Sequence, residues 1–359
     1  MTKDSPGAAK GAMQNRSKTG TPPVVALTIG DPAGIGPEIC LRAVHDPSVR
    51  AACVPIIIGD WDILRLVAKR CKLPQPSCIA SKSDWEHGRC DGMPDVVDCA
   101  AVDARSVQPG KVQKACAQAA YEYIRTAIQA ALERRIGAVA TAPVHKEALK
   151  LAKIPYPGHT EIFAALTKAR RACMMLASDE ITVSFVTTHI GYADVTSKLT
   201  KARIVDVIEL TADAVARLRA VQPRIVVCGL NPHAGENRLF GYGEEEKYIK
   251  PAVARARSKG LRVEGPISPD AAFLPERRRG VDAFVCMYHD QGHIPFKMLA
   301  FDRGVNVTLG LPIVRTSVDH GTAFDIAWSG RASACSMIEA VLWAARLAAW
   351  KKPGRMKTR

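Results

Sequence analysis

Apolar runs and amphipathic stretches alternate along the whole chain. In its first part, the apolar runs are rich in β-branched residues, end in Gly, Pro or Asp, and cover residues 24–30, 54–60 and 137–143. This composition and length are typical of buried strands. Between these runs, apolar residues recur at helical spacing over residues 36–45, 61–71 and 111–135. Alternating strands and helices predict an α/β fold with a mostly parallel sheet and helices on both faces.

The same alternation continues through the rest of the chain. Its strand-like runs are ACMMLAS, ITVSFVTTH, RIVVCGL, AFVCMYH and GVNVTLGLP, and its helical patterns cover about 200–220, 244–260, 321–328 and 332–350. A chain of 359 residues is too long for one simple core. We therefore expect two α/β lobes, the first formed by residues 22–145 with 300–359 and the second by residues 146–299. The polar residues 1–21 predict a disordered leader.

Three histidines follow directly on apolar runs that predict strands. ITVSFVTTH ends at His189, RIVVCGLNPH at His233 and DAFVCMYH at His289. Parallel strands present their carboxyl ends to a common crevice, so three imidazoles there predict a divalent-metal site with room for a substrate. Two alternatives stay open. Each histidine could form only local hydrogen bonds, or His293, four residues after His289, could pair with it on one helical turn.

Other polar clusters also lie next to predicted strands and helix starts. GDPAGIGPE (30–38) lacks the spacing of a dinucleotide fingerprint and the lysine of a P-loop, so Asp31 could contact a ligand or merely cap a helix. His159 and Thr160 lie at a predicted helix start and are expected to contact an anion, although Thr160 could be only a cap. Lys297 and Arg315 are natural partners for a phosphate or carboxylate.

Charge and cysteine content restrict the function further. Of the formal net charge of +15, the first 20 residues supply +3 and the tail KKPGRMKTR +5, together +8, so over half lies in the two ends. This distribution does not predict a nucleic-acid groove, and the remaining positive bias suits a small anionic substrate. No apolar stretch approaches the ~20 residues needed to cross a bilayer. The 11 cysteines contain no C-x-x-C pair, which predicts reduced thiols in a cytoplasmic protein.

Together, the polar segments resemble those of one enzyme family, the 4-hydroxythreonine-4-phosphate dehydrogenases. The matching segments, in order over about residues 22–350, are GDPAGIGPE, TAPVHKEAL, GHTE, TTH, GLNPHAGE, YHDQG, GVNVTLGLP and RTSVDHGTA. The resemblance implies a two-lobed fold similar to isocitrate and isopropylmalate dehydrogenases. It also implies a homodimer whose interlobe site is completed by the partner subunit.

The resemblance implies a role for each candidate residue. Three histidines would carry one divalent metal (Zn, Mg, Mn or Co): His189, His233 and His289. The substrate contacts would be His159, Thr160, Lys297, Asn306 and Arg315. Acidic residues near the reacting centre would be Asp270 and Asp290. NAD or NADP would accept the hydride, and we take Asn231, Gly235 and Asp319 as its candidate contacts.

The family contains branches with different substrates. One oxidises 4-phosphohydroxythreonine in vitamin B6 synthesis, a second acts on 4-phosphorylated threonate or erythronate, and a third oxidises a terephthalate cis-dihydrodiol. The resemblance also implies decarboxylation of the β-keto acid product. The residues of the segments YHDQGHIPFKMLAFD and HGTAFDIA resemble those of the second and third branches more than those of the first. A phosphate acyltransferase and a non-catalytic anion-binding protein are the alternatives from other classes.

Overall fold

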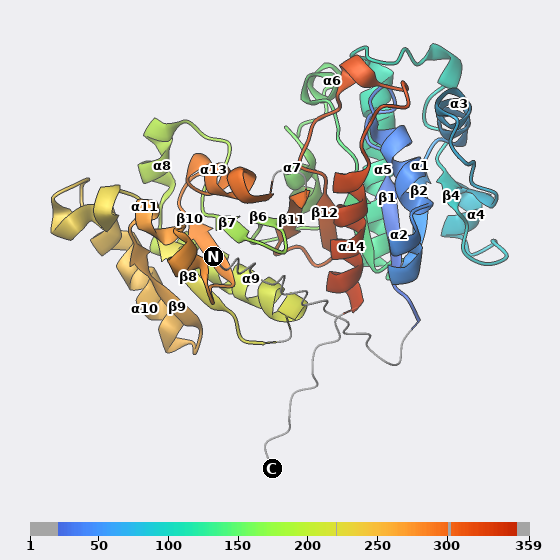
Figure 1. The fold of residues 1–359 in the computed structure, drawn as a ribbon. Coiled ribbons are helices and arrows are strands. Elements are labelled where there is room, and N and C mark those ends of the chain that lie inside the picture. Colours follow the sequence, from blue (N-terminus) through green and yellow to red (C-terminus); the bar gives the residue numbers. More distant parts are fainter. Residues whose placement is uncertain (1–20, 220, 301–302, 350–359) are drawn as a thin grey trace, which may run out of the picture.

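The computed structural model describes residues 21–219, 221–300 and 303–349 (Figure 1). The predicted leader therefore lies outside the described residues, apart from Thr21. Within them, all strands join one 12-stranded sheet, which confirms the predicted α/β class.

One half of the sheet is entirely parallel. Its strands in spatial order are β3 (Ile79–Ser81), β4 (Val96–Asp98), β2 (Val54–Gly59), β1 (Val24–Thr28), β5 (Ala138–Thr141) and β12 (Val314–Ser317). The other half continues with β11 (Val305–Leu309), β6 (Cys173–Ala177), β7 (Thr182–Phe185), β10 (Ala283–Cys286), β8 (Arg224–Cys228) and β9 (Arg262–Ile267). Antiparallel pairing is confined to the centre, where β11 joins β12 and β6, and β6 joins β7. The sheet is thus mostly parallel, as the alternating pattern predicts.

Helices cover both faces of the sheet (Figure 1). Helix α1 (Gly36–Val44) connects β1 to β2, whereas α5 (Lys114–Leu132) leads into β5 on the other side of β1. Because parallel crossovers are right-handed, these opposite directions place α1 and α5 on opposite faces. Helix α14 (Cys335–Ala349) contacts α1 and the strands β5 and β12. In the second half, α9 (Lys201–Arg219), α10 (Lys250–Ser258) and α13 (His289–Ala300) contact the strands.

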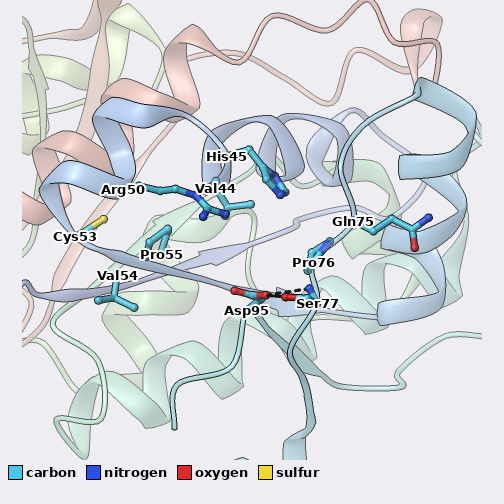
Figure 2. Close-up of a pocket in the computed structure, with 10 residues that line it drawn as sticks. All are labelled: Val44, His45, Arg50, Cys53, Val54, Pro55, Gln75, Pro76, Ser77 and Asp95. Carbon is cyan, nitrogen blue, oxygen red and sulfur yellow. Dashed lines mark hydrogen bonds between the residues drawn. The ribbon is translucent and has the colours of Figure 1, made fainter.

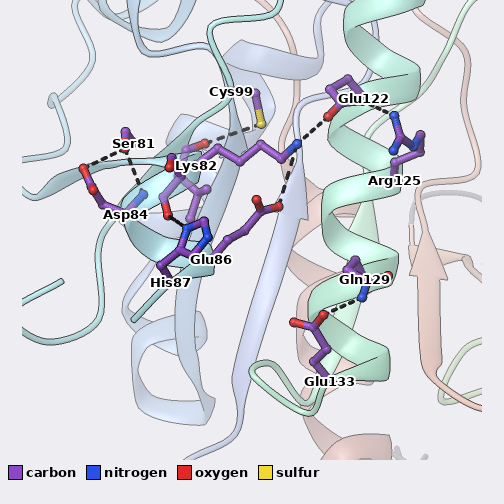
Figure 3. A network of polar contacts seen from close by, with 12 residues as sticks. Ser81, Lys82, Asp84, Glu86, His87, Cys99, Glu122, Arg125, Gln129 and Glu133 are labelled. Atoms are coloured by element: carbon purple, nitrogen blue, oxygen red, sulfur yellow. Dashed lines mark hydrogen bonds and ion pairs between the residues drawn. The ribbon is translucent and has the colours of Figure 1, made fainter. Parts of the chain in front are cut away.

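Most of the remaining elements are short. They are α2 (Pro47–Ala52), α3 (Trp61–Cys71), α4 (Lys82–Glu86), η1 (Ala104–Ser106), α6 (Lys146–Leu151), α7 (His159–Leu166), α8 (Tyr192–Lys198), η2 (Pro232–Arg238), η3 (Glu245–Ile249), α11 (Pro269–Ala272), α12 (Pro275–Arg278) and η5 (Phe324–Ile326). Both α6 and α7 contact α5, so they lie beside the first half of the sheet. Lys82 of α4 reaches Glu122 of α5 at 2.6 Å (Figure 3), a partly exposed ion pair that contributes little to stability.

Two of the predicted elements, one helix and one strand, differ in the structure from the sequence expectation. The helix expected near residues 321–328 is only the short 3-10 turn η5, and Ala323 before it has a φ of +40°. The run ITVSFVTTH leaves the sheet at Phe185, so His189 lies in the loop beyond β7. Apolar periodicity marks the core of an element, but these ends depend on which neighbours continue the hydrogen bonding.

The cysteines and the lengths of the helices bear on two further expectations. All 11 cysteines are free thiols. No helix in the described part of the chain combines the length and apolarity required to span a membrane.

Candidate active site

The three strands that precede the candidate metal ligands are neighbours. Strand β10 lies between β7 and β8 and is parallel to both, so all three end at the same edge of the sheet. His289 is the first residue of α13 after β10, His189 lies in the loop after β7, and His233 lies in η2 after β8. The common edge is as the sequence predicts.

A cavity of about 360 Å³ lies at this edge. It is lined by Met174, His189, His289, Asp290, His293, Ile294, Lys297, Asn306 and Asp319. Six of these are candidate residues from the sequence, drawn from segments more than 100 residues apart. Met174 lies in an apolar run with no chemical signal, so sequence reasoning could not have found it. His293 was flagged by its spacing alone.

Two imidazoles lie close together in the cavity. The ring centroids of His189 and His289 are 5.6 Å apart. Burial, helped by Lys146 and His289, lowers the pKa of His189, so its ring is neutral near pH 7 and has a lone pair to donate. The Nδ1–H of His289 donates to Asp290 at 2.6 Å, which leaves Nε2 available. A carboxylate behind a histidine is the usual support of a metal-binding imidazole.

His293 has a different role from His289. The two rings are stacked, with centroids 3.6 Å apart and planes 11° apart. Imidazole lone pairs lie in the ring plane, so two parallel rings do not aim them at one ion. The Nδ1–H of His293 also donates to the His289 carbonyl at 3.0 Å, and burial lowers the pKa of His293 to about 4. This geometry disfavours a metal held by the His289–His293 pair.

Charged groups around the cavity are already paired. The Tyr192 hydroxyl and His289 both donate to Asp290, and these two hydrogen bonds lower its pKa. Asp290 is therefore a carboxylate at neutral pH and accepts hydrogen bonds. Lys297 of α13 forms an ion pair with Asp319 at 3.1 Å. Asn306 donates to the Met174 sulfur at 3.3 Å, and its buried Oδ1 has no partner among the described residues.

A second group of candidates surrounds Arg315. Its guanidinium is 2% exposed and donates to Thr308 and Thr141, each at 2.8 Å. Burial lowers its pKa to about 9. His159 lies close by, since the charge of Arg315 adds to burial in lowering the pKa of His159 well below 6.5. Its Nε2 is buried without a partner in the described structure.

Thr160 lies in the first turn of α7, one residue after His159. Gly158 is the N-cap of this helix, and no side chain caps it. Thr160 is therefore not the cap, and the capping alternative is wrong.

His233 lies in a third group, on a turn of unusual conformation. Residues 233–238, which we call the left-handed turn, all have positive φ, between +38° and +79°. A left-handed conformation costs roughly 1–2 kcal/mol for each non-glycine residue. Backbone strain of this kind is often found at functional sites.

The contacts of His233 are also separate from those of His189 and His289. Its ring donates to Glu236 at 3.1 Å and lines a cavity of about 450 Å³ with Lys250 and Arg257. A hydrogen bond from Ser268 lowers the pKa of Asp270, and His233 makes a smaller electrostatic contribution. Within residues 21–349, where described, no three His, Cys, Asp or Glu side chains form a group that could hold a metal ion.

The two predicted cofactor contacts beside His233 have structural partners. The Asn231 amide donates to Glu244 and Glu245, each at 3.0 Å. Gly235 lies against Glu245, where a Cβ would be 2.7 Å from Oε2. Their contact with a cofactor stays a prediction.

Asp31 lies in the glycine turn after β1 and is 1% exposed. One carboxylate oxygen accepts from the Ala33 N–H at 2.9 Å, and the other, Oδ2, is buried without a described partner. Burial raises its pKa from 3.8 to about 6. The folded state therefore favours the protonated form, a stabilisation that is complete below pH 3.8 and lost as the pH rises through about 6.

Replacing Asp31 with Asn is expected to stabilise the protein at pH 8. A shift of about two pKa units corresponds to about 3 kcal/mol of the free energy of unfolding. The side-chain amide of the new Asn would lack a hydrogen-bond partner, which reduces this gain. Urea unfolding at pH 8 and pH 4 would measure the free energy of unfolding. The gain should disappear at pH 4, and an equal gain at both pH values would show that the carboxylate charge is not its cause.

Another cavity, of about 310 Å³, lies in the first half of the sheet, beside the start of β2 (Figure 2). Its polar groups already have partners: His45 bonds the Leu41 carbonyl, Arg50 the Val44 carbonyl, and Asp95 accepts from Ser77. These contacts fix helix and strand ends, so this cavity is a weaker candidate site.

Comparison with known proteins identifies relatives over most of the chain. The family model described as pyridoxal phosphate biosynthetic protein PdxA matches residues 51–344. A 4-hydroxythreonine-4-phosphate dehydrogenase from Desulforapulum autotrophicum is 44% identical, with 90% of this chain and 95% of that protein covered. A D-threonate 4-phosphate dehydrogenase from Salmonella typhimurium is 43% identical, with 90% and 98% covered.

Solved structures give the same picture. The crystal structure of a 4-hydroxythreonine-4-phosphate dehydrogenase from Klebsiella pneumoniae matches with a TM-score of 0.79 and 40% identity, covering 91% of this chain and 99% of that one. A terephthalate 1,2-cis-dihydrodiol dehydrogenase from Burkholderia xenovorans matches with a TM-score of 0.66 and 28% identity, covering 90% and 98%.

Proposed function

The chain belongs to the PdxA family and is a dehydrogenase, and from this premise we propose that it oxidises a 4-phosphorylated C4 hydroxy acid with NAD or NADP. The substrate would be 4-phosphothreonate, 4-phosphoerythronate or 4-phosphohydroxythreonine. The main support is the cavity in which a histidine pair lies beside Lys297 and Asn306. Terephthalate cis-dihydrodiol is the alternative substrate, and the lower identity of 28% to that relative makes it the weaker one. The dehydrogenase relatives at 43–44% identity favour oxidation over phosphate acyl transfer.

The proposed reaction has two chemical steps. NAD or NADP, when bound, would supply the hydride acceptor. The C–H bond of the secondary alcohol would break with loss of that hydride, and release of the hydroxyl proton would give a β-keto acid. The C–C bond to the carboxylate then breaks, CO2 leaves, and the electron pair that stays behind takes up a proton. Asp270 and Asp290 are the candidates for handling these protons. The lowered pKa of each keeps it ionised near pH 7, the form that can accept a proton, and also makes it a weaker base.

The donor set at the histidine pair suits a divalent metal. His189 is neutral near pH 7, and His289 is held by Asp290 with Nε2 available. A catalytic zinc or similar ion needs about three protein ligands and one open position. When bound, the metal would supply Lewis-acid polarisation of the alcohol oxygen. His233 would be the third ligand, as the family resemblance implies, and because no three such side chains gather within the described residues, we propose that the site is completed at a dimer interface.

Anion recognition would fall to residues on the neighbouring strands and helices. Arg315 is a buried cation that donates to the hydroxyls of Thr308 and Thr141, and His159 lies close to it. A phosphate or carboxylate there would pair with the guanidinium. Lys297 would exchange its ion pair with Asp319 for the substrate anion. Asn306 would accept a substrate hydroxyl through its unpartnered Oδ1.

Exposed apolar residues support a homodimer. They flank the histidine pair at Ile190, Tyr192, Ile294 and Met298, and they follow the left-handed turn at Leu239, Phe240 and Tyr242. Met298 is 81% exposed and Tyr242 87%. Large apolar side chains gathered on a surface commonly mark an interface. We propose that these two surfaces meet across the dimer and complete each site.

Replacing both Leu239 and Met298 with Asp is expected to give a monomer with little activity. Two buried charges facing each other across an interface would cost several kcal/mol of association energy. Size-exclusion chromatography with light scattering would measure the mass. The matched control is Leu66→Asp in α3, a helix that contacts α1 and β4 in the first half of the sheet, and the Leu66 side chain is 39% exposed. A double variant that stays dimeric would contradict the proposed interface.

A substrate screen tests the function itself. The protein would be mixed with NAD or NADP, Mn²⁺ or Zn²⁺, and each of the four acids, and absorbance at 340 nm and released CO2 would be followed. We expect turnover of a phosphorylated acid, abolished by a chelator and restored by metal. Turnover of the terephthalate dihydrodiol alone would favour that branch. A chelator without effect would rule out the metal.

A further inference from the structure

The left-handed turn is held by one buried carboxylate. Glu245, the first residue of η3, is 0% exposed. Its Oε1 accepts from the backbone N–H groups of Leu230 at 2.9 Å and Asn231 at 2.8 Å. Its Oε2 accepts from the Asn231 amide at 3.0 Å. All of these bonds reach the segment that leads directly into the turn.

Glu244 adds a second carboxylate to the same segment. It is 5% exposed and accepts from the Asn231 amide at 3.0 Å and from the Tyr242 N–H at 2.8 Å. Residues before and after the turn are thereby tied to one pair of neighbouring glutamates. Their hydrogen bonds offset the charge burial that two adjacent carboxylates would otherwise incur.

Glycines make this close packing possible. A Cβ on Gly235 would lie 2.7 Å from Glu245 Oε2, and a Cβ on Gly241 would lie 2.2 Å from the Asn231 amide nitrogen. A Cβ on Gly229 would lie 2.7 Å from the Ala234 Cα. The turn and the carboxylates are therefore in direct contact, and there is no room for the turn to relax toward Glu245.

We propose that Glu245 is a positioning residue that fixes His233 by clamping the left-handed turn. The carboxylate touches neither substrate nor metal and acts through the backbone. Five non-glycine residues in the left-handed region would otherwise return to ordinary conformations, and the His233 ring would move with them. The π-helical turn of η3 fits this role, because such turns are frequent at functional sites. The catalytic part of this inference rests on the proposed function, in which His233 belongs to the site.

Gly235→Ala tests the clamp without removing a polar group. The new methyl would push the turn away from Glu245. Gly260→Ala is the matched control, since Gly260 has a φ of +81°, close to the +79° of Gly235, and a Cβ there meets nothing within 4 Å. Both variants carry the same backbone penalty, so a difference between them reports the contact with Glu245. Glu245→Gln, with Glu246→Gln as its neighbour control, tests the carboxylate itself.

Hydrogen exchange of the full-length protein, followed by mass spectrometry, measures how readily the backbone around the left-handed turn opens, independently of activity. We expect faster exchange over residues 229–245 in G235A and E245Q and unchanged exchange there in G260A and E246Q. For the same two variants, kcat should fall about 10- to 100-fold, as for other residues that support metal ligands. The Mn²⁺ concentration for half-maximal activity should rise similarly. KM for the phosphorylated acid should not change, because Lys297 and Arg315 lie elsewhere.

The outcomes separate this inference from the proposed function. Unchanged exchange in both G235A and E245Q would overturn the clamp. Faster exchange with wild-type kcat and Mn²⁺ dependence would overturn the positioning role. If the wild type oxidises none of the acids, the proposed function fails, while faster exchange in both variants still supports the clamp.

Discussion

Replacing His289 with Ala is expected to lower kcat/KM about 10³-fold while the protein stays folded. The ring centroids of His289 and His189 are 5.6 Å apart, and the carboxylate of Asp290 accepts a hydrogen bond from the His289 ring. Loss of one of three metal ligands would remove several kcal/mol of charge stabilisation in the transition state, and each 1.36 kcal/mol is a factor of ten. Steady-state kinetics at saturating Mn²⁺, with circular dichroism for the fold, would measure the effect.

His87→Ala is the control for this result. His87 follows α4 beside the first half of the sheet, where its ring bonds the Ser83 carbonyl. It should keep wild-type kinetics. His293→Ala separates the two adjacent rings of α13, and we expect it to impair packing against Phe185 more than metal dependence. An H289A variant with wild-type turnover would refute the histidine site.

Replacing Arg315 with Met should separate stability from activity. The guanidinium is buried, hydrogen-bonded only to hydroxyls in the contacts described above, and has a pKa lowered to about 9. Because the folded-state pKa is lowered, the cost of burying the charge is fully present below pH 9 and declines as the pH rises above it. Removing the charge is therefore expected to leave the free energy of unfolding at pH 7 unchanged or to raise it by several kcal/mol.

The same Arg315 variant should lose anion binding. A phosphorylated acid bound to the wild type would pair with the guanidinium, so kcat/KM should fall at least about 100-fold in R315M. Thermal unfolding with the acid present should show a higher Tm for the wild type and no shift for the variant. Arg65→Met, at an exposed ion pair with Asp62, is the control. An R315M protein that is less stable but fully active would show that Arg315 is structural.

The sequence was sufficient for most of the elements, although strands β9 and β12 lie outside the predicted runs. Apolar runs such as 24–28 and 54–59 bury both faces of a strand, so their identity is set by local composition. The rule that parallel strands end at a common edge then brings β7, β10 and β8, with their histidines, to one side of the sheet. Recognisable motifs supplied the residue roles that periodicity alone leaves open.

Other features depend on contacts between distant segments. Nothing in HDQGH distinguishes a chelating pair from the stacked rings of His289 and His293. The burial of Arg315 depends on Thr141, 174 residues away in the chain. The Lys297–Asp319 pair links α13 to the loop after β12. Such properties are set by which side chains meet in three dimensions, and spacing along the chain contains little of that information.

The residues alone were enough to infer the succession of strands and helices, a sheet edge with three histidines and a family of chemistry. The way in which each histidine is held depends on three-dimensional contacts: His189 by burial, His289 by Asp290, and His233 by a strained turn against Glu245. The succession of strands and helices along the chain follows from local hydrophobic periodicity. The left-handed turn instead depends on hydrogen bonds from residues outside it, which offset its backbone strain.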